Sequence, residues 1–226
     1  VSIRPIDSEH SAIWQCLAGQ NRPALSRLIL TASGGPFRDR ADLSDVTRQQ
    51  ALAHPNWRMG PKISVDSATM INKALEVVEA HWLFDASPDI MEIVVHRESI
   101  VHSMVEFVDG SVIAQMGAAD MRTPIQYALT YPTRREGLAE RLDLAGLGTL
   151  TFASPDTERF PGVLLGHQAL RRGGVAPAAM SAANEVAVDL FCRGMLRFCD
   201  IAPAVGEAMV SIGAGGEPTI REIVEA

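Results

Sequence analysis

The segment of residues 54–76, HPNWRMGPKISVDSATMINKALE, concentrates side chains that can do chemistry. Its second half predicts a helix that begins near Ser67. Spacings of three and four residues place Asn72, Lys73 and Glu76 on a shared face of that helix. A helix start with free N–H groups, a capping Ser67 hydroxyl, an amide and a cation suits a phosphate. The same pattern also fits an amphipathic surface helix with an intrahelical Lys–Glu pair, and spacing alone does not choose between the two.

A second group of polar residues, DSE at 7–9, follows an apolar and extended-looking start of the chain. At the end of a strand, residues two apart point the same way, so Asp7 and Glu9 would share one edge. Two carboxylates there and a third from Glu76 make a three-oxygen site for Mg²⁺ or Mn²⁺. The competing interpretation is that Asp7 caps a helix over residues 9–17, which leaves Glu9 for the metal.

A third candidate element is the stretch of residues 26–37, SRLILTASGGPF, which predicts a strand that stops at a Ser-Gly-Gly-Pro turn. Glycines after a strand let the backbone approach a ligand closely. Such junctions also carry Gly and Pro for turn chemistry alone. Beside the other two elements, Ser33 becomes a candidate phosphate ligand.

These motifs together resemble one enzyme family. The segments DSEHSAIWQCL, LTASGGPFR, HPNWRMGPKISVDSATMINKALEVVEAHWLF, SIVHSM and DMRTPI follow one another in the order found in 1-deoxy-D-xylulose 5-phosphate reductoisomerases. The resemblance extends along the whole chain, and the long central motif is highly specific. It implies an NADPH-dependent oxidoreductase of the non-mevalonate isoprenoid pathway. That enzyme rearranges and reduces 1-deoxy-D-xylulose 5-phosphate to 2-C-methyl-D-erythritol 4-phosphate.

The resemblance also implies roles for individual residues by their position. The implied ligands of Mg²⁺ or Mn²⁺ are Asp7, Glu9 and Glu76. The implied substrate-binding residues are Ser8, Glu9, Ser33, His54, Ser67, Asn72, Lys73 and Glu76. The implied catalytic residues are Glu9, Glu76 and His54, the last on a mobile lid loop over residues 54–60. Trp57 and Met59 would belong to this lid. Gly60 and Met121 would lie near the nicotinamide of NADPH.

These residue types suit the implied reaction. A metal held by adjacent carbonyl and hydroxyl oxygens of the substrate acidifies the hydroxyl and polarises the carbonyl, which favours cleavage and rejoining of a carbon–carbon bond. The resulting aldehyde can take a hydride from NADPH. Phosphate binding away from the reacting carbons orients the sugar, and a closing lid excludes water.

The family begins with a dinucleotide-binding domain, and this chain shows no Gly-rich turn between a strand and a helix of the kind that binds a nucleotide. We therefore expect a fragment, inactive alone, made of the catalytic and C-terminal portions. Two other functions stay open. A non-redox lyase or isomerase with the same site would release an aldehyde without consuming NADPH. A non-catalytic, metal-dependent sugar-phosphate binding module would bind ligand without turnover.

Composition argues against several other classes of function. The 226 residues are 47% hydrophobic and 21% charged, which is typical of a globular protein with one large or two small cores. The net charge is −7 and basic residues do not cluster, so we expect no nucleic-acid surface. No apolar run approaches the ~20 residues that span a bilayer, so we expect no membrane insertion. The cysteines, Cys16, Cys192 and Cys199, form no close pair, which fits a reducing cytoplasm.

The elements that must position the candidate residues predict three consecutive regions. Short apolar runs that alternate with helical patterns indicate an α/β (α+β) catalytic domain with a mixed sheet over residues 1–130. Residues 131–150 are predicted to be a connector, and residues 151–226 a small all-helical C-terminal domain. Within the catalytic domain, residues 91–96 predict a buried strand, and residues 104–116 predict a β-hairpin that turns at an Asp-Gly pair.

The C-terminal domain is predicted from helical periodicity over residues 161–170, 176–191 and 201–212. In the second of these, Asn184 and Glu185 are more typical of a cap or an interhelical polar contact than of catalysis, and we assign them no catalytic role. The resemblance implies a homodimer that forms through the catalytic domain, with the hairpin near the interface.

Overall fold

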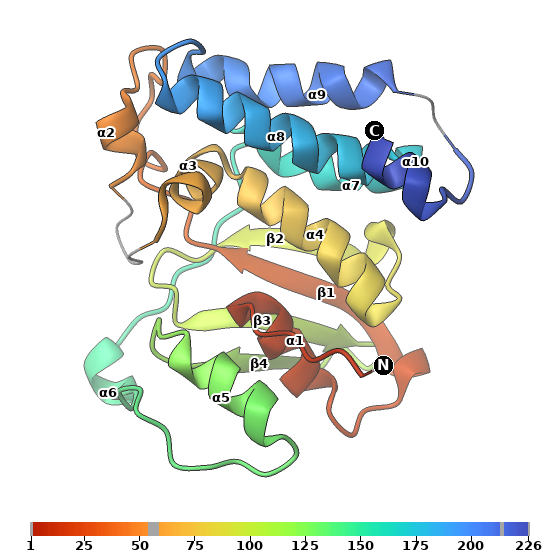
Figure 1. Ribbon diagram of the computed structural model, residues 1–226. Helices are drawn as coiled ribbons and strands as arrows, with labels where there is room; N and C mark the ends of the chain where they lie inside the picture. Colours follow the sequence, from red (N-terminus) through yellow and green to blue (C-terminus); the bar gives the residue numbers. More distant parts are fainter. Residues whose placement is uncertain (1, 54–58, 213–214, 226) are drawn as a thin grey trace. The chain divides into compact units, whose positions relative to one another are not determined.

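The computed structural model describes residues 2–53, 59–212 and 215–225, and it divides the chain into two compact units (Figure 1). The first unit consists of residues 1–33 and 80–154, and the second of residues 34–79 and 155–226. Both units are therefore discontinuous in sequence. The domain boundaries expected at residues 130 and 150 do not coincide with this division, and they stay a prediction.

The first unit is built on a mixed sheet, as the sequence predicts. Its strands are β1 Leu25–Ala32, β2 Met91–Val95, β3 Val101–Phe107 and β4 Val112–Met116, in the order β2-β1-β3-β4. β1 is parallel to β2 and antiparallel to β3, and β3 is antiparallel to β4. In this register Leu28 of β1 lies opposite Met91 of β2 and Val105 of β3.

The strands form where the apolar runs predicted them. β1 is buried over residues 28–32, which fits the uninterrupted apolar run of Leu28, Ile29 and Leu30 in its second half. β2 confirms the strand expected over 91–96. The hairpin is confirmed as well, with Gly110 at a positive φ of 83° in the turn between β3 and β4. β3 begins three residues earlier than expected, at Val101.

Helices cover the sheet of the first unit. Helix α1, Ser8–Leu17, packs against β3 and β4, and α5, Arg122–Thr130, packs against α1 (Figure 1). The rings of Trp14 in α1 and Tyr127 in α5 lie 4.8 Å apart, centroid to centroid. The shorter helices of this unit are the 3-10 turns η1 Arg22–Ala24 and η2 Pro88–Ile90 and the four-residue α6 Leu144–Leu147. α6 lies within the predicted connector.

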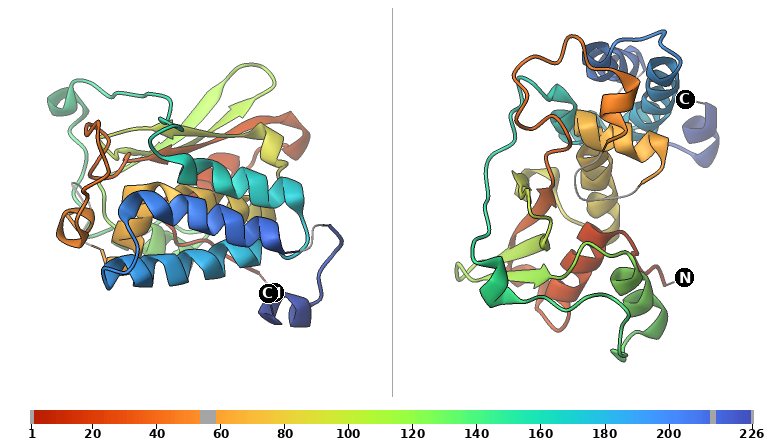
Figure 2. Two further views of the ribbon diagram at one scale, coloured as in Figure 1. Left: turned by 90° about the horizontal axis from the view of Figure 1, so that it is seen from above. Right: turned by 90° about the vertical axis from the view of Figure 1, so that its left-hand side faces the viewer.

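The second unit is helical. Its helices are α2 Arg48–Ala51, α3 Pro61–Thr69, the first part of α4 Ile71–Phe84, α7 Leu165–Arg172, α8 Ala176–Cys192, α9 Ile201–Ser211 and α10 Ile220–Glu225, with 3-10 turns η3 Pro161–Leu164 and η4 Phe198–Asp200. α8 packs against α7, α9 and α3. Figure 2 shows α7, α8 and α9 running alongside one another. These elements confirm the three helices predicted in the C-terminal region.

Two general expectations can be compared with the described residues. No helix among them combines the length and the apolar character needed to cross a membrane. Cys16, Cys192 and Cys199 are free thiols, as their spacing predicts. Burial raises the pKa of the Cys16 thiol to about 11, which disfavours its thiolate form at neutral pH.

Candidate functional site

The first group of candidate residues lies at the start of α1. Asp7 is the N-cap, and its Oδ1 accepts a hydrogen bond from the Ser8 backbone N–H at 2.8 Å. The Ser8 hydroxyl donates to Oε2 of Glu9 at 2.5 Å. The buried His10 ring places its Nδ1 3.4 Å from the other Asp7 oxygen. Asp7 and Glu9 are themselves only half-buried, so their carboxylates retain access to a ligand.

The prediction of an extended strand before this group is wrong. Residues 2–6 are irregular, since Pro5 has no N–H to donate to a sheet and Asp7 already starts a helix. The capping interpretation of Asp7 is confirmed, with the helix beginning at Ser8 rather than Glu9. Asp7 and Glu9 are therefore a cap and a first-turn residue, not two positions on one strand edge.

Ser33 directly follows β1 and is half-buried. The glycine turn that follows Ser33 allows the backbone to pass close to a helix. Gly35 has a positive φ of 67°, and a Cβ at this position would lie 2.6 Å from the backbone oxygen of Ser67 in α3. A glycine is therefore required where the chain after β1 passes against α3.

The helix predicted to begin near Ser67 is in fact two helices. α3 begins at Pro61 behind the cap Gly60, which is the usual place for proline, and Ser67 lies in its last turn rather than at its cap. Met70 breaks the helix with a left-handed backbone, φ 60°. α4 then begins at Ile71, so Asn72 and Lys73 occupy its first turn.

The predicted shared face of Asn72, Lys73 and Glu76 is present on α4. One Glu76 oxygen accepts from Nδ2 of Asn72 at 2.6 Å, and the other lies 2.5 Å from Nζ of Lys73. Lys73 and Glu76 are buried, with side chains 5% and 3% exposed. The intrahelical Lys–Glu pair of the surface-helix interpretation is therefore confirmed, but the expected exposure of Lys73 and Glu76 is wrong. Each charge depends on the other, because an unpaired charge at this depth is strongly disfavoured.

A second buried polar cluster includes Asp66, the residue before Ser67, and two of its three members were not predicted from the sequence. Asp66 of α3 accepts a hydrogen bond from Nδ2 of Asn184 in α8 at 2.9 Å. Its other oxygen lies 2.6 Å from Nζ of Lys62. The signal was a Lys–Asp pair four residues apart beside an apolar run. The contact confirms the interhelical role expected for Asn184.

Lid and cofactor residues are described only in part. His54 and Trp57 lie outside the described residues. Met59 is half-buried, and Gly60 is exposed at the cap of α3. Met121 is the half-buried N-cap of α5 in the first unit. The described candidates thus form two groups. Asp7, Ser8, Glu9, Ser33 and Met121 belong to the first unit, and Met59, Gly60, Ser67, Asn72, Lys73 and Glu76 to the second.

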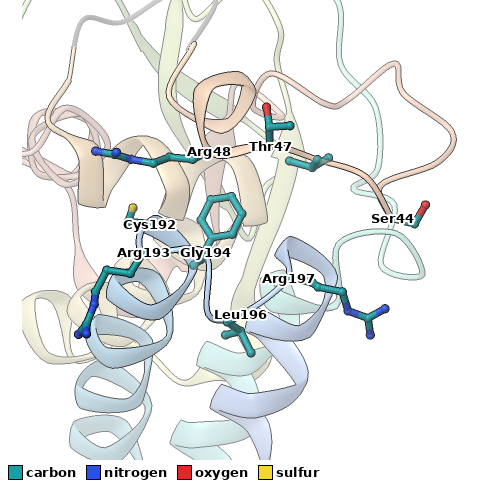
Figure 3. A pocket seen from close by; sticks show the side chains of 10 residues that line it. Ser44, Thr47, Arg48, Cys192, Arg193, Gly194, Leu196 and Arg197 are labelled. Carbon is teal, nitrogen blue, oxygen red and sulfur yellow. The ribbon is translucent and has the colours of Figure 1, made fainter.

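A separate pocket of about 460 Å³ lies in the second unit, between the segment around α2 and the end of α8 (Figure 3). Its charged lining residues are Arg48, Arg193 and Arg197, and none of the proposed site residues that the structure describes lines it. In Figure 3 the Arg197 side chain points away from Arg48 and Arg193. Arg193 and Arg197 are paired with the carboxylates of Asp189 and Asp200. The guanidinium groups therefore do not converge on one ligand.

Comparisons with known proteins agree with the sequence motifs. A family model described as the 1-deoxy-D-xylulose 5-phosphate reductoisomerase C-terminal domain matches residues 3–84, and one described as the DXP reductoisomerase C-terminal domain matches residues 116–226. The chain is 52% identical to the 1-deoxy-D-xylulose 5-phosphate reductoisomerase of Acetivibrio thermocellus and 57% identical to that of Heliobacterium modesticaldum. Both alignments cover 100% of this chain, but only 60% and 58% of the relatives.

Solved structures give the same result. The enzyme from Zymomonas mobilis, in complex with NADPH, matches with a TM-score of 0.90 and 44% identity over 98% of this chain and 57% of its own. A reductoisomerase solved with NADPH, fosmidomycin and magnesium matches with a TM-score of 0.88 and 44% identity over 92% of this chain and 54% of its own. This chain belongs to the 1-deoxy-D-xylulose 5-phosphate reductoisomerase family, of which it contains the C-terminal domains.

Proposed function

We propose that this chain holds the metal and the substrate for the NADPH-dependent conversion of 1-deoxy-D-xylulose 5-phosphate to 2-C-methyl-D-erythritol 4-phosphate. The chain spans about 60% of the length of the relatives it matches, so the activity is that of a larger assembly of domains. The observation that carries the proposal is the buried group of Asn72, Lys73 and Glu76, found in a chain 44% identical to a reductoisomerase solved with NADPH, fosmidomycin and magnesium.

The phosphate of the substrate is bound by Ser33, Ser67, Asn72 and Lys73. Support comes from the position of Asn72 and Lys73 in the first turn of α4, where the helix dipole is positive and favours an anion. A buried Lys73 in that turn is unfavourable unless an anion lies close by. Glu76 supplies one negative charge, and a phosphate would supply a second with the oxygen acceptors that Lys73 and Asn72 can use.

Asp7, Glu9 and Glu76 bind the divalent cation. Three carboxylates suit Mg²⁺ and Mn²⁺, which both prefer oxygen ligands. When bound, the cation polarises the substrate carbonyl and lowers the pKa of the adjacent hydroxyl. Glu9 and Glu76 contribute to catalysis by holding the cation, and the Ser8 hydroxyl, which donates to Glu9, has an oxygen that can accept a hydrogen bond from the sugar.

The lid and cofactor residues complete the proposed site. His54, Trp57 and Met59 close over the sugar and exclude water, and Gly60 and Met121 contact the nicotinamide of NADPH, which supplies the hydride. Gly60 supports this assignment, because a Cβ there would meet no atom of the described residues within 4 Å, which leaves room for a flat ring beside the backbone.

The protein acts as a cytoplasmic homodimer. β4 is an edge strand of the sheet, and Val108, Val112 and Ile113 of the hairpin are exposed at 72%, 49% and 38%. An exposed apolar edge favours pairing with another chain. Free cysteines fit a reducing compartment. Sedimentation analysis tests the dimer, and a Val112→Lys change on β4 should shift it toward the monomer.

Calorimetric binding of 1-deoxy-D-xylulose 5-phosphate to the chain, with Mg²⁺ and then with a chelator, tests the site. We expect binding that requires the metal, lost in Glu76→Gln and kept in Glu207→Gln, a matched change at an exposed position of α9. Binding that ignores the chelator would overturn the metal assignment. NADPH consumption by this chain joined to the dinucleotide-binding portion of a relative tests the redox step, and aldehyde release without NADPH consumption would contradict it.

A further inference from the structure

The cluster of Lys62, Asp66 and Asn184 has no role in the site described so far. Asn184 is fully buried and Asp66 is 1% exposed, although both carry strongly polar groups. Burial raises the pKa of the Asp66 carboxyl, while the contacts from Lys62 and Asn184 oppose that rise. Among the described residues the Asn184 Oδ1 finds no hydrogen-bond partner. A polar cluster with an unsatisfied oxygen is a poor source of stability, since apolar side chains of the same volume would fill this space at less cost.

The cluster does, however, fix the rotation of α3. Consecutive residues on a helix point about 100° apart, so when Asp66 faces α8 the direction of Ser67 is set as well. Ser67 is half-buried, and its backbone oxygen lies close to Gly35. An apolar contact tolerates rotation and sliding, but the hydrogen bond from Asn184 to Asp66 does not.

We propose that Asn184 is a positioning residue for substrate binding. Through Asp66, it holds α3 in the rotation that presents the Ser67 hydroxyl to the phosphate of the substrate. The inference rests on the proposed phosphate role of Ser67, and it gives the C-terminal helices a part in substrate recognition, because α8 carries Asn184. Lys62, at the exposed end of the cluster, balances the Asp66 charge.

A coupling experiment tests this role. Asn184→Leu keeps a side chain branched at Cγ but removes the hydrogen bond. We expect it to weaken metal-dependent binding of 1-deoxy-D-xylulose 5-phosphate about tenfold, and to leave binding of the phosphate-free sugar unchanged. In a protein that already carries Ser67→Ala, Asn184→Leu should not weaken substrate binding further, because both changes remove the same contact between Ser67 and the phosphate. Ser181→Ala, one turn earlier on α8, is the matched control and should bind as the wild type does.

A conservative variant provides rescue. Asp66→Asn can accept from Nδ2 of Asn184 and donate to its Oδ1, so the interhelical contact persists without the charge. We expect it to bind substrate within about twofold of the wild type. If Asn184→Leu fails to fold, Asn184→Ser, whose shorter side chain does not reach Asp66, takes its place.

The outcomes separate this inference from the proposed function. Absence of substrate binding by the folded wild-type chain overturns both. Wild-type binding with an unchanged Asn184→Leu affinity overturns the positioning role alone. Equal losses for the phosphorylated and phosphate-free sugars, or additive losses with Ser67→Ala, likewise show a general structural effect and reject it.

Discussion

The two groups of candidate residues differ in how far their charged side chains are buried and in how those charges are paired. At the start of α1, Asp7 and Glu9 are half-exposed, and their neighbours Ser8 and His10 are held by local capping contacts. On α4, Lys73 and Glu76 are buried and neutralise each other. Ligand binding and stability should therefore be separable in the first group and coupled in the second, because only the second loses its internal charge balance when one residue changes.

The largest expected effect is on the Lys73–Glu76 pair. Lys73→Met should lower the free energy of unfolding by about 3–5 kcal/mol, since it leaves a buried carboxylate without its cation. Urea denaturation measures this. Lys73→Met with Glu76→Leu should recover much of the loss. The exposed pair of Arg193 and Asp189 on α8 is the control, and Arg193→Met should cost about 0–1 kcal/mol. Equal losses of unfolding free energy in Lys73→Met and Arg193→Met would contradict the proposed coupling of charge pairing to stability on α4.

Gly35 extends the comparison to the backbone. Gly35→Ala should cost about 1–2 kcal/mol for its positive φ, and more because the new Cβ meets the Ser67 oxygen. Gly19→Ala carries the same kind of φ, 77°, with no atom within 4 Å of the Cβ, so it measures the backbone strain alone. Thermal unfolding of both variants isolates the steric part. If Gly35→Ala lowers the stability no more than Gly19→Ala does, the close approach of Gly35 to α3 does not contribute to the cost.

Substitutions of Asp7 test whether ligand binding and stability can be separated in the first group. Asp7→Ala should cost about 1 kcal/mol because the first turn of α1 loses its cap. Asp7→Asn keeps the cap and should change stability by only a few tenths of a kcal/mol, yet it should weaken Mg²⁺ binding. Thermal unfolding and magnesium calorimetry on both variants measure the two effects. A large stability loss in Asp7→Asn would mean that the charge, and not the cap, stabilises this end of the chain.

The smallest expected effect is a pH dependence from Asp66. Burial raises the pKa of this carboxyl above its ordinary 3.8, so the folded state binds the proton more tightly than the unfolded state. Its contribution to stability is therefore present at low pH and falls as pH rises from the ordinary value through the raised one. Asp66→Asn should remove this decline. Urea denaturation over a pH series decides it, and parallel curves for the two proteins would count against the raised pKa.

The sequence predicted the elements better than their junctions. The strands and the hairpin followed from apolar runs and an Asp-Gly turn, and the helices of the C-terminal region followed from periodicity. The helix start was placed near Ser67 because serine often caps helices, although Gly60-Pro61 carried the stronger signal. The break at Met70 had no signal, since methionine seldom adopts a positive φ and only packing around it can impose one.

Of the candidate site, the sequence predicted the features that depend on local spacing and not those that depend on distant packing. Spacing alone gave the face of Asn72, Lys73 and Glu76, because helical periodicity fixes it wherever the helix begins. Burial of the Lys73–Glu76 pair did not follow from the spacing, since burial depends on packing against elements distant in sequence. The contact from Asp66 to Asn184 spans 118 residues, beyond the reach of local pattern.

That separation has a consequence during synthesis on the ribosome. Residues 34–79 are made before the segment 155–226 that completes their unit. At typical elongation rates, the 118 residues between Asp66 and Asn184 take roughly 6–24 s to appear. During that delay the inner face of α3, with a carboxylate and apolar side chains meant for α8, has no native partner from that helix. The nascent chain should therefore be most dependent on chaperones, and most prone to aggregate, in this interval.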